Sequence, residues 1–215
     1  MKKAIGKSGI HMGDLRQSAS GLSFGVLAGG KSRRMGKDKA HLTIRGKSFL
    51  ETVLEAGSGF SERLVSLSAD AAPVLMQSVR TVRDENPQYG PLEGIRCLLR
   101  SCTNGACLIT ATDMPFLSAD FLEALAERYC GSGNLALTHR GRPEPLCSIY
   151  CRECLPEIER LLAEGCARPV LLFERVPTAY VPFEELGFSE AVLQNINRMD
   201  EYLAITKEAA YADRI

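Results

Sequence analysis

Strand-like and helix-like patterns alternate along the chain from residue 23 onward, and this alternation is the feature that most restricts the fold. Short apolar runs at 23–28 and 106–111 predict buried strands. The apolar spacing at 49–56 predicts a helix, and a second helix is expected to begin at Ser118. Regular exchange of the two patterns predicts an α/β fold with a mostly parallel central sheet.

The remaining expected elements continue the alternation. Strands are expected at 63–68, 79–82, 135–138, 146–150 and 180–183, and helices at 92–99, 153–162 and 199–210. Ligands of parallel sheets bind beyond the carboxyl ends of the strands. The residues that follow these strands are therefore site candidates: Gly29-Gly30, Asp84, Asp113 and, after the last expected strand, Asn195-Ile196-Asn197.

The length of 215 residues fits one domain. We expect a disordered leader at 1–21, which is polar and has no apolar core of a signal peptide, followed by a single domain at 22–215. No apolar run approaches the roughly 18 residues that a membrane span needs. These features predict a cytoplasmic protein that does not associate with a membrane.

Charge and cysteine content narrow the function further. Lys plus Arg and Asp plus Glu both number 26, so the net charge of zero argues against a nucleic-acid partner. The 8 cysteines are expected to be reduced thiols. Cys151 and Cys154 have the spacing of metal ligands, but a single CxxC is a weak zinc signal. We interpret this pair as the beginning of a helix.

The segment after the first expected strand carries the strongest functional signal. Gly29, Gly30 and Gly36 allow backbone amides to approach a ligand closely. Five cations accompany them, namely Lys31, Arg33, Arg34, Lys37 and Lys39. Consecutive amides and dense positive charge suit the phosphates of a nucleotide, whereas the alternative interpretation is a solvated basic turn.

The stretch from Gly25 to Ser32 also matches the Walker A pattern literally. In a P-loop the strand ends before the first glycine, but here Val26-Leu27-Ala28 is the apolar part of the strand itself. We interpret the match as coincidental. It nevertheless defines a second function class, a P-loop kinase or NTPase.

Several motifs in this chain occur together, in the same order, in one known family. They are Leu27-Ala28-Gly29-Gly30-x-Ser32-x-Arg34-Met35-Gly36-x-Asp38-Lys39, Arg45-Gly46-Lys47-Ser48-Phe49-Leu50, Asp84-x-x-Pro87-x-x-Gly90-Pro91-Leu92-x-Gly94, Thr112-Asp113-Met114-Pro115-Phe116-Leu117, Arg142-x-Glu144-Pro145-Leu146 and Asn195-Ile196-Asn197. From about Phe24 to Tyr202 the chain resembles the MobA-type molybdenum cofactor guanylyltransferases. The resemblance implies their Rossmann-like three-layer α/β/α nucleotidyltransferase fold.

Two positions depart from the family pattern. Arg198-Met199 follows the Asn-Ile-Asn segment, where the family often has Thr-Pro at the start of its last helix. The second strand runs into Ser68-Ala69-Asp70 instead of ending in an asparagine. These departures concern contacts to the base and to the pterin more than nucleotidyl transfer itself.

The resemblance also implies a reaction and a set of roles. GMP would pass from GTP to molybdopterin with release of pyrophosphate, and cofactor-delivery proteins or molybdoenzymes would be protein partners. Arg34 and Lys39 would contact the phosphates. The nucleotide site would comprise Leu27, Ala28, Gly29, Gly30, Lys39, Asp84 and Asp113, and the acceptor side would include Pro145, Asn195 and Asn197. Because the attacking phosphate is already anionic, no catalytic histidine is required.

The residue types of Asp113 and Asp84 each allow a functional and a structural interpretation. Asp113 ends a buried strand, where a carboxylate suits Mg²⁺, which prefers oxygen ligands and substrate phosphates. The alternative for Asp113 is a simple cap. Asp84 could contact the nucleotide or the metal shell, or it could only form the turn before Asn86-Pro87.

Base choice rests on Gly29. The absence of a methyl group there would leave room for a purine near the loop, so we expect GTP to be preferred over CTP and ATP. The alternatives are a cytidylyltransferase or another member of the same superfamily, the P-loop enzyme, and a nucleotide-binding module without catalysis.

Overall fold

The computed structural model describes residues 21–29 and 42–212, with the side chains of Pro87 and of residues 207–212 left aside. A central sheet of eight strands runs in the order β10-β7-β9-β6-β1-β4-β5, with β8 paired to β7. Its strands are β1 (Ser23–Leu27), β4 (Glu62–Leu67), β5 (Val79–Arg83), β6 (Ala106–Ala111), β7 (Asn134–His139), β8 (Arg142–Pro143), β9 (Cys147–Cys151) and β10 (Thr178–Pro182). A separate hairpin joins β2 (Thr43–Ile44) to β3 (Lys47–Ser48).

The sheet is mostly parallel, as expected. β1 pairs in parallel with β4 and β6, β4 with β5, and β10 with β7. β9 runs antiparallel to β6 and β7, and the short β8 is antiparallel to β7. The carboxyl ends of β1, β4, β5 and β6 therefore meet at one edge of the sheet.

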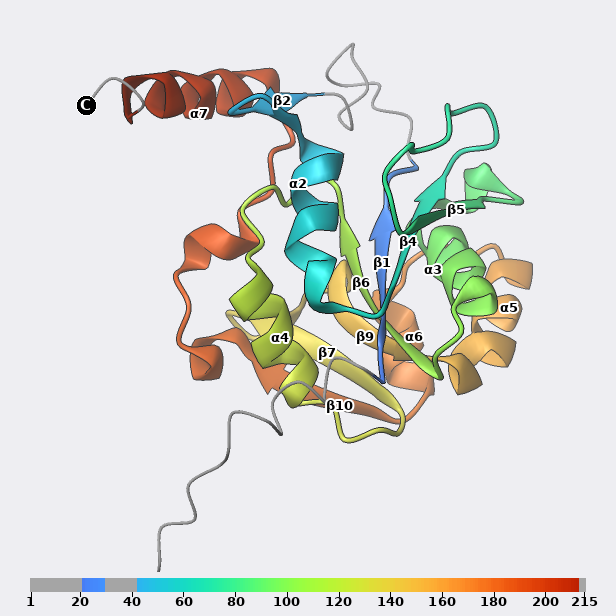
Figure 1. Cartoon of the computed structure of the whole chain (residues 1–215). Helices are drawn as coiled ribbons and strands as arrows, with labels where there is room; N and C mark the ends of the chain where they lie inside the picture. Colours follow the sequence, from blue (N-terminus) through green and yellow to red (C-terminus); the bar gives the residue numbers. More distant parts are fainter. Residues whose placement is uncertain (1–20, 30–41, 213–215) are drawn as a thin grey trace, which may run out of the picture.

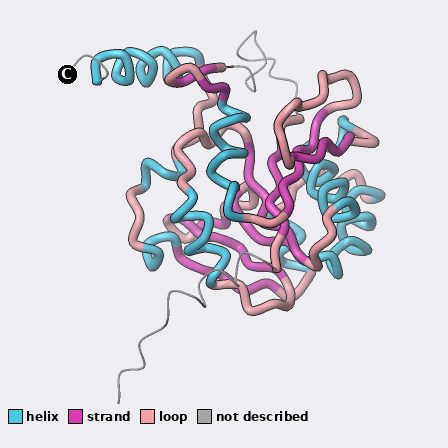
Figure 2. Tube along the Cα trace, in the orientation of Figure 1, coloured by secondary structure: helices cyan, strands magenta, loops and turns pink. Residues whose placement is uncertain are grey.

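Helices cover both faces of this sheet, which gives the three expected layers (Figures 1 and 2). One face carries α2 (Phe49–Ala56) and α4 (Ala119–Glu127), and the other carries α3 (Gly90–Ser101), α5 (Leu155–Ala163) and α6 (Val170–Arg175). The last helix, α7 (Met199–Ala212), projects beside the β2–β3 hairpin at the carboxyl end of β1 (Figure 1). Across the described part of the chain, no helix has the length and apolar character needed to span a membrane.

The sequence specifies these elements through burial and capping. Every residue of β1 and β6 is buried, which explains their uninterrupted apolar runs. Ser48 begins α2 with a capping box, because its hydroxyl accepts from the Glu51 amide while Glu51 accepts from the Ser48 amide. The hydroxyl of Ser118 likewise accepts from the Phe121 amide at the start of α4.

Buried apolar side chains form two clusters of unequal size. The main core contains residues from both faces of the sheet, among them Phe24, Leu98 and Ile109. The second cluster contains Leu42, Phe49 and Ile196, with Ile44, Phe116, Met199, Tyr202 and Ile205 packed against it. The second cluster joins the hairpin and the beginning of α7 to the body of the protein.

Several segments differ from the sequence expectations. The helix expected at 153–162 begins at Leu155, after a 3-10 turn η4 (Arg152–Cys154), and the hairpin and α6 were not expected. Asn195 does not follow directly from the last strand. β10 lies at the far edge of the sheet, and the chain returns through η5 (Phe183–Leu186) and η6 (Glu190–Leu193) before it reaches Asn195. The other 3-10 turns are η2 (Gly57–Gly59) and η3 (Pro87–Tyr89).

Candidate active site

The site begins where β1 ends. The Ala28 amide still donates to the carbonyl of Ser66 on β4 at 2.9 Å, and Leu27 accepts from the Thr112 amide at 3.2 Å. Gly29 follows and is exposed. A Cβ atom at Gly29 would lie 2.6 Å from Oδ2 of Asp84, so an added side chain would force the Asp84 carboxylate to move. The glycine therefore allows an acidic side chain to lie directly against the end of β1.

Asp84 follows β5 and is only 9% exposed. Its amide donates to the carbonyl of Leu67 at 2.9 Å, and its Oδ1 accepts a hydrogen bond from the hydroxyl of Ser66. Burial raises the pKa of Asp84, the Ser66 hydrogen bond lowers it, and the nearby charge of Glu93 raises it, with a net increase. The Asp84 carboxyl group is thus buried against the exposed Gly29.

Glu93 holds the loop that follows Asp84. It is fully buried in α3, and its Oε1 accepts from the amides of Glu85 at 3.1 Å and Asn86 at 2.9 Å. The Arg96 guanidinium donates to both carboxylate oxygens of Glu93 and to Oε2 of Glu85. Burial would raise the pKa of Glu93, but the hydrogen bonds from Arg96 and the Asn86 amide outweigh it and lower the pKa.

Sequence reasoning missed Glu93, which stands at a variable position between Leu92 and Gly94 of the motif. A signal was present. Glu93 and Arg96 have the i, i+3 spacing of an ion pair, and both lie within an otherwise apolar stretch of the helix. What the spacing alone could not indicate is that the acid also binds two backbone amides of a neighbouring loop.

Asp113 lies on the other side of the end of β1. It follows β6, its residue is partly buried, and its carbonyl accepts from the Ile196 amide at 2.8 Å. The neighbouring Thr112 amide is bonded to Leu27. Asp84 approaches the end of β1 from the β4–β5 side, whereas Asp113 is carried by β6. The two acids therefore flank the end of β1.

The exposed residues Asn195 and Asn197 are held at this edge by the buried Ile196 between them. Oε2 of Glu201 accepts from the amides of Asn197 at 2.8 Å and Arg198 at 3.0 Å, at the beginning of α7. Glu201 thus caps α7 in a chain that has Arg198-Met199 where the related pattern often has Thr-Pro.

Pro145 lies in the loop between β8 and β9. Its carbonyl accepts from the Tyr150 hydroxyl at 2.7 Å, and Cys147 pairs with Thr110, so the preceding loop lies beside the end of β6. Burial raises the pKa of Glu144 in this loop, and the proximity of His139 lowers it, with a net increase. His139 itself ends β7, as an ordinary strand-edge residue would.

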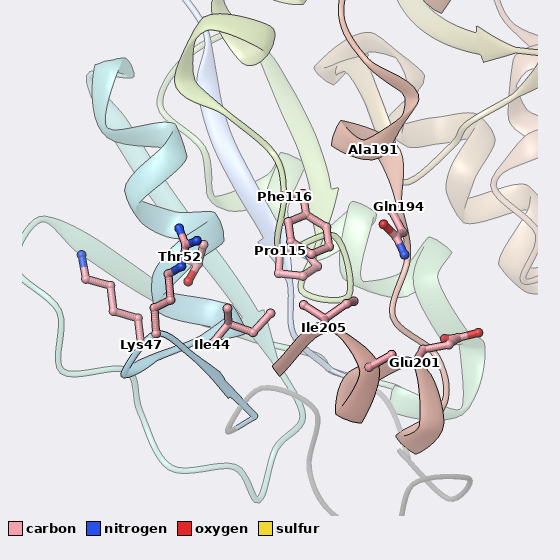
Figure 3. A pocket seen from close by; sticks show the side chains of 11 residues that line it. Ile44, Lys47, Thr52, Pro115, Phe116, Ala191, Gln194, Glu201 and Ile205 are labelled. Carbon is pink, nitrogen blue, oxygen red and sulfur yellow. The ribbon is translucent and has the colours of Figure 1, made fainter. Parts of the chain in front are cut away.

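A groove of about 1000 Å³ is lined by Pro115 and Phe116, which follow Asp113 in the chain (Figure 3). Pro115 and Phe116 form its centre, with Ile44 and Lys47 of the hairpin on one side and Gln194 and Ile205 on the other (Figure 3). Its other lining residues are Arg45, Thr52, Ala191, Glu201 and Ala204. Apolar side chains in its lining are combined with the polar ones of Arg45, Lys47, Thr52, Gln194 and Glu201, a combination that suits a small organic ligand.

The structure thus brings Leu27, Ala28, Gly29 and Asp84 together, and it joins the segment of Asp113 to that of Asn195 and Asn197. Gly30, Arg34 and Lys39 lie outside the described residues. The Walker A alternative loses its basis, because Gly25 lies in the middle of buried β1, between Leu64 and Ile109 on the adjacent strands. Gly25 is therefore unable to cradle a phosphate.

Asp113 and the pair Cys151 and Cys154 are the candidate metal ligands in the sequence. Among residues 21–29 and 42–212, no group of three or more His, Cys, Asp or Glu side chains is arranged to hold a metal ion. Cys151 ends β9 and Cys154 ends η4, directly before α5, and both are buried free thiols. The interpretation of this pair as the beginning of a helical segment is confirmed.

The sheet with helices on both faces is the fold of solved nucleotidyltransferases, and this chain is a nucleotidyltransferase. Molybdopterin-guanine dinucleotide biosynthesis protein A from Archaeoglobus fulgidus is similar with a TM-score of 0.74 and 27% identity, covering 88% of this chain and all of that one. A nucleotidyl transferase from Methanothermobacter shares the fold with a TM-score of 0.70 and 23% identity, covering 89% of this chain and 98% of that one.

The family follows from sequence comparison. Residues 25–178 match the MobA-like NTP transferase domain, and the chain belongs to that family. A probable molybdenum cofactor guanylyltransferase from Carboxydothermus hydrogenoformans is 31% identical over 189 residues, covering 86% of this chain and 95% of its own length. Another, from Methanothermobacter thermautotrophicus, is 32% identical over 189 residues, covering 83% of this chain and 96% of its own length.

Proposed function

We propose that this enzyme transfers GMP from GTP to molybdopterin and releases pyrophosphate, with Mg²⁺ as its cofactor. The proposal is supported by relatives named molybdenum cofactor guanylyltransferases, which align over most of the chain. The single observation that carries it is the exposed Gly29 at the end of β1, with the Asp84 carboxylate against it and the Asp113 segment bonded to Leu27 through the Thr112 amide.

The donor chemistry of this edge fits magnesium. Mg²⁺ is usually held by one or two carboxylates together with substrate phosphates, and it rarely occupies a cage built by the protein alone. Asp113 offers a carboxylate at the strand end, and the described residues contain no larger preformed ligand cluster. When bound, the ion would neutralise charge that develops on the phosphates during transfer.

The nucleotide lies across the end of β1 in this proposal. Backbone groups of Leu27, Ala28, Gly29 and Gly30 approach it, and Asp84 contacts it from the β5 side. Arg34 and Lys39 bind the phosphates, where cations stabilise the leaving pyrophosphate more strongly in the transition state than in the ground state. These two cations are assigned from the sequence motif alone.

The acceptor enters from the opposite side. Asn195 follows Gln194 of the groove, Asn197 lies just before α7, and Pro145 lies in the loop before β9. A terminal phosphate oxygen of molybdopterin attacks the α-phosphorus of GTP, and the bond from that phosphorus to the β-phosphate oxygen breaks. Because the attacking oxygen is already anionic, the step requires no protein base.

The proposed function also implies a cellular location and protein partners. We place the enzyme in the cytoplasm, where its 8 cysteines would remain reduced. Proteins that deliver the molybdenum cofactor, or molybdoenzymes that receive it, are its proposed partners. Neither a nucleic acid nor a membrane has a role.

The basis for GTP preference needs revision, because the space beside Gly29 is already filled. The position that a methyl group would occupy is within 2.6 Å of the Asp84 carboxylate, so the glycine makes room for an acid of the protein itself. GTP preference therefore rests on the guanylyltransferase relatives and not on Gly29.

The decisive experiment is a comparison of pyrophosphate release from GTP, CTP and ATP, with molybdopterin as acceptor and Mg²⁺ present. We expect GTP to give the highest kcat/KM, because a site that hydrogen-bonds one base rejects others strongly. A higher kcat/KM for CTP would overturn the substrate assignment. Absence of pyrophosphate release with every nucleotide would overturn the proposed function.

A further inference from the structure

We infer that Glu93 is a positioning residue for the nucleotide edge. It holds the backbone of Glu85 and Asn86 from inside α3, and thereby keeps the Asp84 carboxylate against Gly29. The inference rests on the proposed function in one respect only, namely that Asp84 faces the nucleotide.

The first step concerns the loop after β5. Past Asp84 the chain leaves the sheet, and its next two amides no longer have strand partners. A single oxygen, Oε1 of Glu93, accepts from both of them, at 3.1 Å from Glu85 and 2.9 Å from Asn86. Two bonds from consecutive amides to one buried atom fix the direction in which the chain leaves Asp84.

The second step concerns the charge of Glu93. A fully buried carboxylate is costly unless it is paired, and Arg96, itself 7% exposed, supplies the pair while also reaching Glu85 at 2.6 Å. Replacement of such buried pairs by apolar residues is often neutral or even stabilising. A gain in the free energy of unfolding therefore does not explain the Glu93–Arg96 pair. The geometry that Glu93 gives to the loop after Asp84 does explain it.

The third step connects α3 to the site. A Cβ atom at Gly94 would lie 2.6 Å from Cδ2 of Leu27 and 3.2 Å from Oγ of Ser66, so the first turn of α3 packs directly against the end of β1. Ser66 in turn donates to Asp84. Because Glu93 is next to Gly94, its position is fixed relative to the same strand end that Asp84 contacts.

The test measures Mg²⁺-GTP affinity by calorimetry and stability by thermal unfolding in four variants. Glu93→Ala removes the acceptor and should raise the Kd about 10- to 100-fold, as loss of a positioning contact does. Glu93→Gln keeps an oxygen for the two amides but leaves Arg96 with the exposed Glu85 in place of its buried charged partner. It should unfold at a lower temperature than wild type and yet keep its Kd within about threefold.

Leu99→Ala is the matched structural control. Leu99 is as buried as Glu93 but lies about 9 Å further along α3, given a rise of about 1.5 Å per residue. This variant should unfold at a lower temperature and bind GTP as wild type does. If Glu93→Ala does not fold, the double variant Glu93→Leu with Arg96→Leu removes the acceptor without leaving an unpaired charge, and it takes the same place in the comparison.

A double-mutant cycle with Asp84→Asn completes the test. If Glu93 acts through Asp84, Glu93→Ala should change the Kd of the Asp84→Asn protein by less than about threefold, because the contact it positions is already lost. An undiminished effect in that background, or a Kd for Glu93→Ala equal to that of Leu99→Ala, would overturn the inference and leave the proposed function intact. Failure of the wild-type protein to bind any nucleotide would overturn both.

Discussion

The two sides of the candidate site are built differently. On the Asp84 side every partner belongs to the sheet or to α3: Ser66, Glu93 and Gly94 are all buried, and they surround the end of β1. On the groove side the β2–β3 hairpin and α7 are joined to the body by a second cluster, whose buried members are Leu42, Phe49 and Ile196, whereas η6 contributes Val192 and Leu193 to the main core. The Asp84 side is part of the main core, whereas the hairpin and α7 on the groove side pack on the smaller cluster.

The difference in packing indicates that the two sides differ in rigidity. Side chains in a densely packed core hold one geometry, which suits the alignment of phosphates for in-line transfer. Elements with few buried contacts open locally at low free-energy cost. We therefore expect the nucleotide side to be rigid and the acceptor side to adjust around a larger ligand.

The largest expected effect is that of Asp113→Ala, at the boundary between the two sides. Its carboxylate is assigned to the metal, so turnover should fall at least 100-fold, which corresponds to about 2.7 kcal/mol of transition-state stabilisation. Its backbone bond to Ile196 remains, so the melting temperature should stay close to that of wild type. Activity within about threefold of wild type would remove the metal assignment.

Gly29→Ala tests the rigidity of the nucleotide side. The added methyl group would press on the Asp84 carboxylate at 2.6 Å, and overpacking of this kind costs about 1–3 kcal/mol. Affinity for GTP and CTP should fall together by about tenfold. In an Asp84→Ala background the same methyl group meets no carboxylate and should cause little further loss. A loss confined to GTP would instead restore the interpretation that Gly29 makes room for the purine.

Tyr202→Ala tests the adjustable side. The Tyr202 ring packs edge-on against Phe49 at 6.0 Å, and its hydroxyl donates to the carbonyl of Thr43 at 2.9 Å. Loss of both contacts should lower the free energy of local opening of α7 by about 1–3 kcal/mol, measured by hydrogen exchange. The KM for the acceptor should rise while the Kd for GTP stays constant, and Tyr202→Phe should show a smaller change. A parallel rise of the GTP Kd would mean that the two sides are not independent.

The smallest expected effect concerns the cost of keeping Asp84 buried. Because its pKa is raised in the folded protein, mainly by burial, ionised Asp84 reduces stability at neutral pH, and this cost disappears as the pH falls through the folded-state pKa. Asp84→Asn should therefore unfold at a higher temperature than wild type at about pH 7.5, with a difference that shrinks at about pH 4. Equal melting temperatures at both values would contradict this account.

The fold could be predicted from the sequence where burial alone decides the structure. The bounds expected for 49–56 and 106–111 are those of α2 and β6, because an amphipathic helix and a doubly covered strand each leave a clear apolar pattern. The antiparallel direction of β9 could not be predicted, because a run such as Cys147–Cys151 shows that a strand is buried but not how it is oriented. The six-residue α6 was too short to show a period.

The same limit applies to the site. Gly29, Asp84 and Asp113 could be predicted as neighbours of one sheet edge, because parallel strands bring their carboxyl ends together. Ser66 and Glu93 could not, since their contacts depend on the pairing of β4 with β1 and on how α3 packs over that pair. Residues that face a ligand can be recognised from a sequence motif. Residues that hold them in place become apparent only from the packing of the folded chain.

The bond from the Ile196 amide to the carbonyl of Asp113 has a consequence for how the enzyme is made. Chains emerge from the ribosome with their amino-terminal part first, and the strands that surround Gly29 and Asp84 are complete long before residue 196 leaves the exit tunnel. The growing polypeptide would thus acquire its nucleotide half early and its acceptor half only near the end of translation. Chains interrupted before that point would lack a complete site for the transfer.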